Sequence, residues 1–244
     1  MKKYYEVMFK GNISSFYKLL ENDLIKNEKK FIVTANPETF MKALNDKELD
    51  KLLSDKASTL VPDGIGIVSS AKMLGYNIKE RITGVDIAYE LLKLGSNLNK
   101  TIYLFGSKQE VIDKTLNVIK NNYPNLKVVG ATNGYVDNKD FVFEEIAKLK
   151  PDIVLVALGI PLQEKLIYKH LNKFKKGIFV GVGGSLDVIS GCKKRAPKIF
   201  IKLNLEWLYR IIKEPKRIKR FYESNIKFMI YTYKLKKSSG GNKW

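Results

Sequence analysis

The sequence predicts an α/β protein: a Rossmann-like doubly wound, mostly parallel sheet with a basic helical C-terminal appendage. Three observations predict this fold. Short runs rich in β-branched and aromatic residues recur along the chain, and each is followed by a helical pattern. The runs are apolar without alternation, as expected of strands that are covered on both faces. After Gly191 this rhythm stops, and a basic segment rich in aromatic residues takes its place.

The apolar runs give the expected order of the strands. Each run has a length typical of a strand and is bounded by turn-forming residues. Parallel strands of this kind end at one edge of the sheet, and ligands bind beyond those carboxyl ends. We expect strands at residues 31–36, 59–64, 101–106, 127–132, 152–159 and 177–184.

Polar side chains and glycines stand at several of these strand ends. Thr34 and Asn36 follow the first strand, and Asp63 follows the second. Because the strand ends should meet at one edge, these residues are candidates for a shared binding site. The ends of the fifth and sixth strands add Gln163, Glu164, Gly183, Gly184 and Asp187.

The chain divides into three expected parts. These are a core of residues 1–191, a basic helical appendage of residues 192–237 and a flexible tail of residues 238–244, which is rich in Ser and Gly. Within the appendage we expect one helix over residues 199–212. Pro215 should interrupt it or start the next helix, because proline fits a first helical turn and not a helix interior.

The end of the chain carries an excess of positive charge. Residues 193–244 hold sixteen Lys or Arg and three Glu, which gives +13 of the net charge of +19. From residue 216 to residue 236, apolar residues recur every three or four positions, so we expect an amphipathic basic helix. Such a segment suits an anionic membrane surface or a nucleic-acid backbone. The alternative is a merely solvated basic face.

Other classes of protein are disfavoured by composition. One cysteine and one histidine make a zinc cluster and a histidine-based catalytic triad implausible. His170 lies in a polar run and is expected to be an exposed helical residue. No apolar run approaches the ~20 residues of a membrane span, and the first residues lack the apolar core of a signal peptide.

The glycines at Gly181, Gly183 and Gly184 follow a strand and precede a helix. Glycines in such a turn let backbone amides approach a phosphate, although a tight turn needs glycine in any case. The spacing is not that of a dinucleotide-binding motif, which favours a nucleoside diphosphate over a nicotinamide cofactor.

Several polar residues each have two interpretations. Asp63, within Pro-Asp-Gly, is either a turn residue or a carboxylate base, for which no suitable histidine competes. Gln163 and Glu164 either solvate the first turn of a helix or face a ligand. Arg81 either pairs with a neighbouring acid or binds a substrate anion.

Three arginines of the appendage are candidates for phosphate binding. Arg210, Arg217 and Arg220 would share one face of a continuous helix, although Pro215 intervenes. Arginine binds phosphate through two parallel hydrogen bonds. The other interpretation is a solvated basic face.

Seven blocks of the sequence together resemble the WecG/TagA/CpsF family of bacterial glycosyltransferases. They follow the order of the family from about Phe31 to Phe221. The chain departs from the family at Ile160 and Leu162, where Ser and Lys are more frequent, which leaves one cation fewer near the site. The blocks are TANPE, VPDGIGIV, ERITG, LFGS, ALGIPLQE, GVGGSLDVISGCKKRAP and EWLYRIIKEPKRIKRF.

The resemblance implies an inverting, metal-independent transfer of a sugar, expected to be N-acetylmannosamine. The donor would be a UDP-sugar and the acceptor undecaprenyl-diphosphate-linked N-acetylglucosamine, in cell-wall or surface polysaccharide synthesis such as that of teichoic acid. It implies Asp63 as the general base and no cofactor. Thr34, Asn36 and Gln163 would lie in the acceptor pocket, and the three appendage arginines would hold diphosphate.

The resemblance also implies where the protein works. A lipid-linked acceptor places the enzyme in the cytoplasm, peripherally on the inner face of the plasma membrane, with anionic lipid and no nucleic acid as partner. A homo-oligomer is left open. The competing interpretation is a Rossmann-type nucleic-acid-binding or RNA-modifying protein that uses the basic tail. A catalytically silent scaffold is the third, and the intact Asp63 disfavours it.

Overall fold

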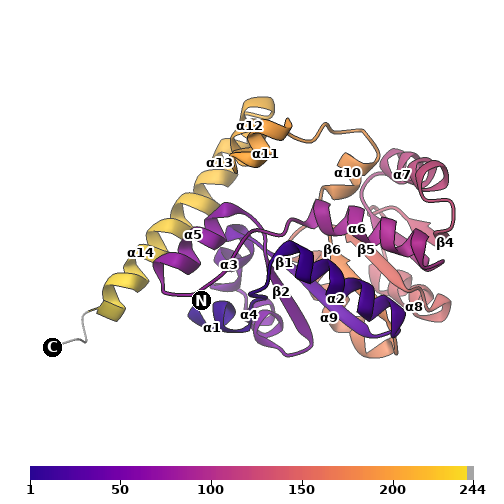
Figure 1. The fold of residues 1–244 in the computed structure, drawn as a ribbon, viewed down its shortest axis with the longest axis horizontal. Coiled ribbons are helices and arrows are strands. Elements are labelled where there is room, and N and C mark those ends of the chain that lie inside the picture. The colour runs from indigo at the N-terminus through magenta and orange to yellow at the C-terminus, as the bar shows by residue number, and fades with distance from the viewer. Residues whose placement is uncertain (241–244) are drawn as a thin grey trace.

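A sheet of six parallel strands forms the centre of the structure, a computed structural model that describes residues 1–240 (Figure 1). The strand order is β2-β1-β6-β5-β3-β4. The six predicted strands are confirmed, with ends shifted by a few residues. The strands are β1 (Lys29–Ala35), β2 (Ser58–Pro62), β3 (Thr101–Gly106), β4 (Lys127–Thr132), β5 (Ile153–Ala157) and β6 (Gly177–Gly181).

Five helices of the core begin at a side chain that caps them. Such a side-chain oxygen accepts a hydrogen bond from a free N–H of the first turn. The capping residues are Asn12, Asn36, Asp46, Thr83 and Asn138, at the starts of α2, α3, α4, α6 and α8 in turn. The helices up to residue 191 are α1 (Lys2–Val7), α2 (Ile13–Ile25), α3 (Pro37–Ala43), α4 (Lys47–Ser54), α5 (Ile65–Met73), α6 (Gly84–Asn97), α7 (Gln109–Asn122), α8 (Lys139–Leu149), α9 (Leu162–His170), η1 (Leu171–Lys173) and α10 (Ser185–Ile189).

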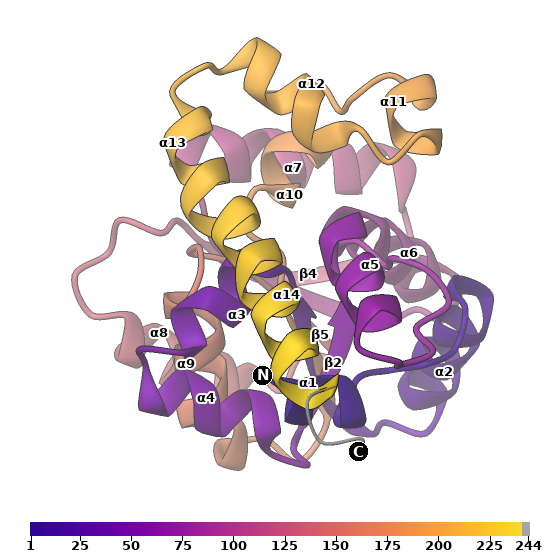
Figure 2. The same cartoon turned by 90° about the vertical axis from the view of Figure 1, so that its left-hand side faces the viewer.

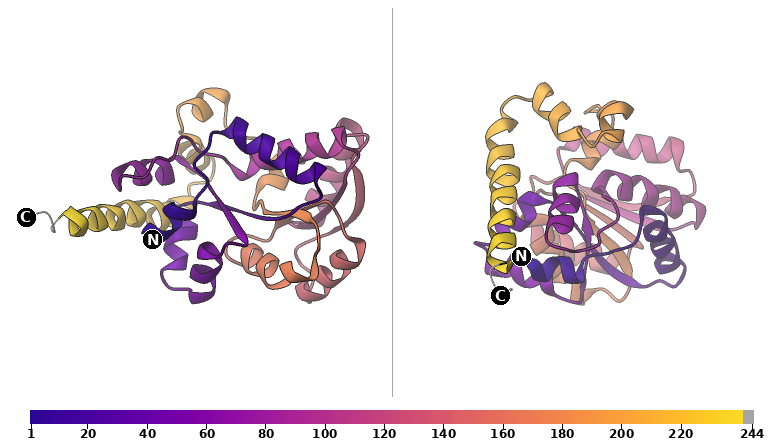
Figure 3. Two further views of the ribbon diagram at one scale, coloured as in Figure 1. Left: turned by 60° about the horizontal axis from the view of Figure 1, so that its bottom comes forward. Right: turned by 60° about the vertical axis from the view of Figure 1, so that its left-hand side comes forward.

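Helices cover both faces of the sheet, as Figure 3 shows. Alternate strand residues enter two apolar clusters: Phe31 and Val33 pack on one face, and Ile32 packs on the other. The first cluster includes residues of α3, α4, α5, α8 and α9, and the second includes residues of α2, α6, α7 and α10. All residues of β5 and β6 are buried, which explains their unbroken apolar runs.

The C-terminal segment, defined here as residues 192–240, is entirely helical or irregular. The prediction of one helix over residues 199–212 is wrong, because the helix is interrupted at Asn204. The φ of this residue is 60°, in the left-handed region that asparagine tolerates. The interruption at Pro215 is confirmed. The helices are α11 (Lys198–Lys202), α12 (Glu206–Lys213), α13 (Arg217–Phe221), η2 (Tyr222–Ile226), which is a π-helical turn, and α14 (Lys227–Gly240).

The long helix α14 runs past α3 and α5 on the outside of the core (Figure 2). It is fixed there by Phe228, which is fully buried and lies 6.0 Å from Phe40 of α3 between ring centres. Because α14 continues to Gly240, residues 238–240 of the expected flexible tail are helical. Residues 241–244 of that tail lie outside the described residues.

His170 is buried, so the expectation of an exposed histidine is wrong. Its ring is 3% exposed, stacks on Phe143 at 5.3 Å and lies 2.6 Å from Asp140 through Nε2. The residue packs between α9 and α8, on the side of the helix that faces the core. Its role is therefore structural packing.

Candidate active site

The neighbouring strands β1 and β6 lead into helices on opposite faces of the sheet. Helix α3 follows β1 and packs in the first apolar cluster, whereas α10 follows β6 and packs in the second. The chain thus diverges between two adjacent strand ends, which is where doubly wound sheets bind ligands. The Thr34 hydroxyl joins the two ends by donating to the Gly181 carbonyl over 3.2 Å.

A cavity of about 860 Å³ lies at this edge, between the strand ends and the C-terminal segment. Its volume is in the range of pockets that enclose whole small-molecule ligands. Every candidate site residue except Glu164 lines it. These are Thr34, Asn36, Asp63, Arg81, Gln163, Gly183, Gly184, Asp187, Arg210, Arg217 and Arg220.

Asp63 lies at the end of β2, inside this cavity. Its backbone N–H donates to the Ala35 carbonyl over 2.9 Å, which fixes the residue beside the end of β1. Gly64 follows with a φ of 95°, so the Pro-Asp-Gly sequence is a tight turn as well as a site. Burial raises the pKa of Asp63 to about 7, against the opposing effect of the nearby Arg210 charge. A carboxylate with this pKa can accept a proton as a general base near neutral pH.

Asn36 is held in place by its role as the cap of α3. Its Oδ1 accepts the Thr39 N–H over 3.0 Å, while the Thr39 hydroxyl lies 3.3 Å from the Asn36 N–H. This capping box engages the carbonyl oxygen of the side chain. The side chain therefore has a fixed position at the cavity, next to Thr34.

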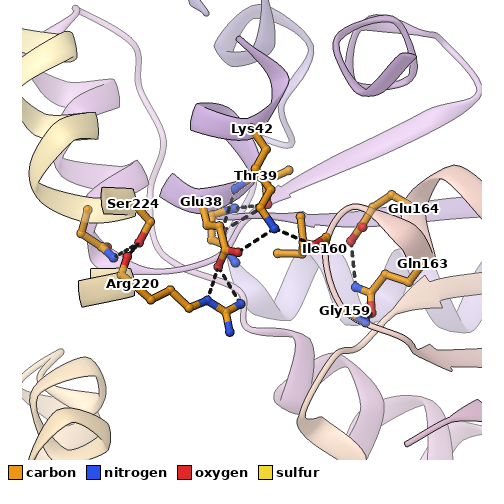
Figure 4. A network of polar contacts seen from close by, with 11 residues as sticks. Glu38, Thr39, Lys42, Gly159, Ile160, Gln163, Glu164, Arg220 and Ser224 are labelled. Atoms are coloured by element: carbon orange, nitrogen blue, oxygen red, sulfur yellow. Dashed lines mark hydrogen bonds and ion pairs between the residues drawn. The ribbon is translucent and has the colours of Figure 1, made fainter. Parts of the chain in front are cut away.

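Gln163 connects two strand ends from within the wall of the cavity (Figure 4). Its Oε1 accepts the N–H groups of Gly159 and Gly183, each over 3.1 Å. Its Nε2 donates to Glu164 over 2.7 Å, so both ends of the amide are engaged. Glu164 lies behind it, 1% exposed, and burial raises the pKa of its carboxyl group to about 7.

The glycine turn after β6 offers less to an anion than its sequence predicts. The Gly183 N–H donates to Gln163, so this amide is already engaged. Gly183 has a φ of 48°, which the turn requires. Gly184 is exposed at the start of α10, and Asp187 lies on that helix with its carbonyl accepting the Lys193 N–H.

Arg81 pairs with an acid of the C-terminal segment rather than with its neighbour Glu80. Its Nη1 donates to Glu206 over 2.7 Å and its Nη2 to the Ile201 carbonyl over 3.0 Å. Arg195 approaches the other oxygen of Glu206 at 3.6 Å and pairs with Asp86 at 2.7 Å. These charged residues connect α6 and the end of β2 to α11 and α12.

The three candidate arginines of the C-terminal segment differ in their contacts. Arg217 pairs with Glu214 at 2.6 Å. Arg220 crosses to α3 and donates twice to Glu38, over 2.9 and 2.7 Å (Figure 4). Arg210 is exposed at the cavity and forms no ion pair with the residues that the structure describes. Its charge is the one that most strongly lowers the pKa of Asp63.

Sequence reasoning missed Glu38, Arg195 and Glu206, all of which line the cavity. A signal existed for Glu206, because it is one of three acids among residues 193–244, which hold sixteen Lys or Arg. Its partner Arg81 lies 125 residues earlier in the sequence, and no local pattern identifies it. Within residues 1–240, no group of three His, Cys, Asp or Glu side chains is arranged to hold a metal ion.

Comparisons with known proteins identify the family of the chain. The family model "Glycosyl transferase WecG/TagA/CpsF family" matches residues 7–241. The chain is 40% identical over 211 residues to the N-acetylglucosaminyldiphosphoundecaprenol N-acetyl-beta-D-mannosaminyltransferase of Bacillus subtilis (strain 168), covering 86% of this chain and 82% of the relative. It is 38% identical over 209 residues to the enzyme of the same name from Staphylococcus aureus (strain MW2), covering 85% and 80%. The chain therefore belongs to the WecG/TagA/CpsF family of glycosyl transferases.

Proposed function

We propose that this glycosyl transferase moves N-acetylmannosamine from a UDP donor to N-acetylglucosaminyl-diphosphoundecaprenol, with inversion at the anomeric carbon. The supporting observation is the juxtaposition in one cavity of Asp63, a carboxyl group whose pKa is raised to about 7, with Arg210, a cation that forms no ion pair within residues 1–240. The activity named for the relatives at 38 to 40% identity supports the choice of sugar and acceptor.

Asp63 acts as the base in this mechanism. Its carboxylate accepts the proton of an acceptor hydroxyl, and the oxygen attacks the anomeric carbon as the bond from that carbon to the UDP oxygen breaks. A single displacement of this kind inverts the configuration and needs one carboxylate as base, by analogy with inverting glycosidases. Thr34 and Asn36, fixed beside Asp63 by their hydrogen bonds, bound the acceptor side of the pocket.

The charge that develops on departing UDP is met by cations of the C-terminal segment. Arg210 is the first candidate, because its guanidinium group faces the cavity without an ion pair among residues 1–240. Arg217 and Arg220 already have carboxylate partners, so a diphosphate must displace Glu214 or Glu38 to reach them. Fixed cations in a site that excludes water stabilise a leaving anion well. We expect transfer to persist in a chelator, since these arginines supply the charge.

The C-terminal helices offer a surface suited to a membrane. Five apolar side chains lie exposed at spacings of four, four, four and three residues, on one side of the helical run. Lysines of the same helices flank them, and lysine is attracted to anionic lipid. None of the described helices is long and apolar enough to cross a bilayer. The five residues are Ile218, Tyr222, Ile226, Ile230 and Tyr233.

We propose that this surface rests on the inner leaflet, where a lipid-linked acceptor is found. Flotation with anionic vesicles tests the idea. The full chain should float, and Ile226→Glu with Ile230→Glu should float much less. The matched variant Tyr135→Glu changes an exposed aromatic residue outside the segment and should float like the wild type. Equal flotation of the first variant and the wild type would remove the membrane role.

A transfer assay tests the function itself. A panel of UDP-sugars is offered with a soluble lipid-diphosphate N-acetylglucosamine analogue, with and without chelator. We expect transfer from UDP-N-acetylmannosamine in both conditions. If transfer occurred only from another UDP-sugar, the proposed donor would be wrong. Absence of transfer from every donor, together with salt-sensitive RNA binding, would favour the nucleic-acid-binding alternative.

A further inference from the structure

Glu206 is unusual among the residues of the C-terminal segment. It is the one buried residue of α12, and neither α11 nor α13 buries any residue. Its side chain is 8% exposed, in a segment whose charge is strongly positive. Burying a carboxylate is unfavourable unless it is paired with cations and hydrogen-bonded. A buried acid on an otherwise exposed helix therefore needs partners from the core side.

The nearer partner of Glu206, Arg81, lies close to the end of β2. Arg81, at 2.7 Å, precedes Ile82, whose N–H donates to the Pro62 carbonyl over 2.7 Å, directly before Asp63. Arg81 also donates to the Ile201 carbonyl, so it contacts both α11 and α12. Arg81 thus links Glu206 to the end of β2, the strand that leads into the proposed base Asp63.

The second arginine, Arg195, adds a connection to α6. It lies 3.6 Å from Glu206 and 2.7 Å from Asp86, whose other oxygen accepts the Thr83 hydroxyl over 2.5 Å. Thr83 caps α6, which is packed in the core. The cluster therefore joins α12 to two fixed elements of the core.

The aromatic contacts of α12 lie within the C-terminal segment. Trp207 stacks on Phe221 at 4.5 Å, and Tyr209 lies 5.5 Å from Phe200, so both aromatic contacts are internal to the C-terminal segment. Another charged contact between the segment and the core, Arg220 to Glu38, leaves the arginine side chain 62% exposed, and exposed ion pairs contribute little. The ion pair of Glu206 with Arg81 is less exposed and joins α12 itself to the core.

We propose that Glu206 is a positioning residue, which docks α12 on the Arg81–Arg195 pair and so places Arg210 over Asp63. Residues four apart on a helix lie on the same side, one turn from each other. Arg210 follows Glu206 by four residues, so fixing Glu206 fixes where the guanidinium group of Arg210 lies. Arg81 then acts through Glu206 rather than on the substrate. This inference rests on the proposed function of Arg210 and adds how its position is set.

The test compares Glu206→Gln with the wild type by hydrogen exchange of residues 198–213 and by sugar-transfer kinetics. Breaking a buried ion pair is strongly unfavourable, so exchange of this region should rise by at least ~10-fold. Displacing Arg210 should lower kcat by about 10²-fold, while circular dichroism of the core is unchanged. Glu223→Gln, an exposed glutamate of the same segment, should match the wild type in both measurements.

Two outcomes would overturn the inference. One is exchange of residues 198–213 in Glu206→Gln equal to that of the wild type. The other is increased exchange with an unchanged kcat, since α12 would then move without consequence for Arg210. The exchange measurement needs no substrate. A wild-type protein that transfers no sugar would therefore refute the proposed function while the docking role of Glu206 is still decided by exchange.

Discussion

Different forces stabilise the core and the C-terminal segment. Every residue of β5 and β6 is buried in apolar contacts, whereas α11 and α13 bury no residue at all. The core supplies Asp63 in a fixed, desolvated position, and the segment, which is joined to the core partly by ion pairs, supplies the cation Arg210. The division suggests that the rigid part positions the proton acceptor, and that the other part delivers charge where the leaving group needs it.

The largest expected effect concerns Asp63, the proton acceptor that the core supplies. Asp63→Asn keeps the size of the side chain and removes the base, so kcat should fall by roughly 10² to 10⁴-fold while the fold is retained. Steady-state transfer kinetics measure it, with thermal melting as the control for folding. Activity near that of the wild type would exclude Asp63 from the mechanism.

The next effect concerns the segment. Arg210→Ala removes a cation that lines the cavity and has no ion pair among the described residues. The kcat should fall by about 10 to 10²-fold, since a group that stabilises developing charge acts in the transition state. Lys219→Ala removes a cation of the same segment that does not line the cavity, and should have little effect. Equal kinetics of the two variants would support a solvated basic face instead.

A third prediction concerns the stability of the core. Burial raises the pKa of Glu164 from 4.5 to about 7, so the stabilising effect of its bound proton is present below pH 4.5 and lost as the pH rises through 7. Between pH 5 and pH 8, the free energy of unfolding of Glu164→Gln should therefore fall by about 1–3 kcal/mol less than that of the protein with Glu164. Denaturant unfolding at several pH values measures it.

Asp63 contributes to the same decline, because its pKa is raised to the same value. The comparison is therefore made in the Asp63→Asn background, and Glu110→Gln, a change at an exposed acid, serves as the control. If the free energy of unfolding depended on pH in the same way with and without Glu164, its carboxyl group would titrate normally in the folded protein, which would contradict the prediction.

The smallest effect concerns the ion pair at the mouth of the cavity. Glu38→Gln removes the partner of Arg220, and an exposed pair of this kind contributes 1 kcal/mol or less. We expect a shift in melting temperature of at most a few degrees and a lower KM for the diphosphate acceptor, because Arg220 becomes free. A raised KM would show that Glu38 itself assists binding.

Much of the core could be predicted because its signals are local. The apolar runs mark the strands, and parallel strands bring Thr34, Asp63 and Gln163 to one edge. The orientation of Gln163 could not be predicted. Its side-chain amide is hydrogen-bonded to two turns, at Gly159 and Gly183, which come close together only when the chain is folded. The family resemblance supplied the reaction, which the residue pattern alone left open.

The C-terminal segment was harder to predict. The break at Asn204 depends on one residue in a left-handed conformation, and no sequence pattern requires it. The burial of Glu206 depends on Arg81, which lies 125 residues earlier. His170 shows the same limit in the core, because its burial depends on packing against Phe143 of another helix.

The pH dependence of kcat/KM in the wild type and in Arg210→Ala tests most directly whether the two regions form one active site. Burial raises the pKa of Asp63 and the Arg210 charge lowers it, so the acid limb of the wild type should lie near pH 7. Removing Arg210 should move that limb to higher pH. An acid limb at the same pH in both proteins would contradict the account, because the segment would then not reach the base.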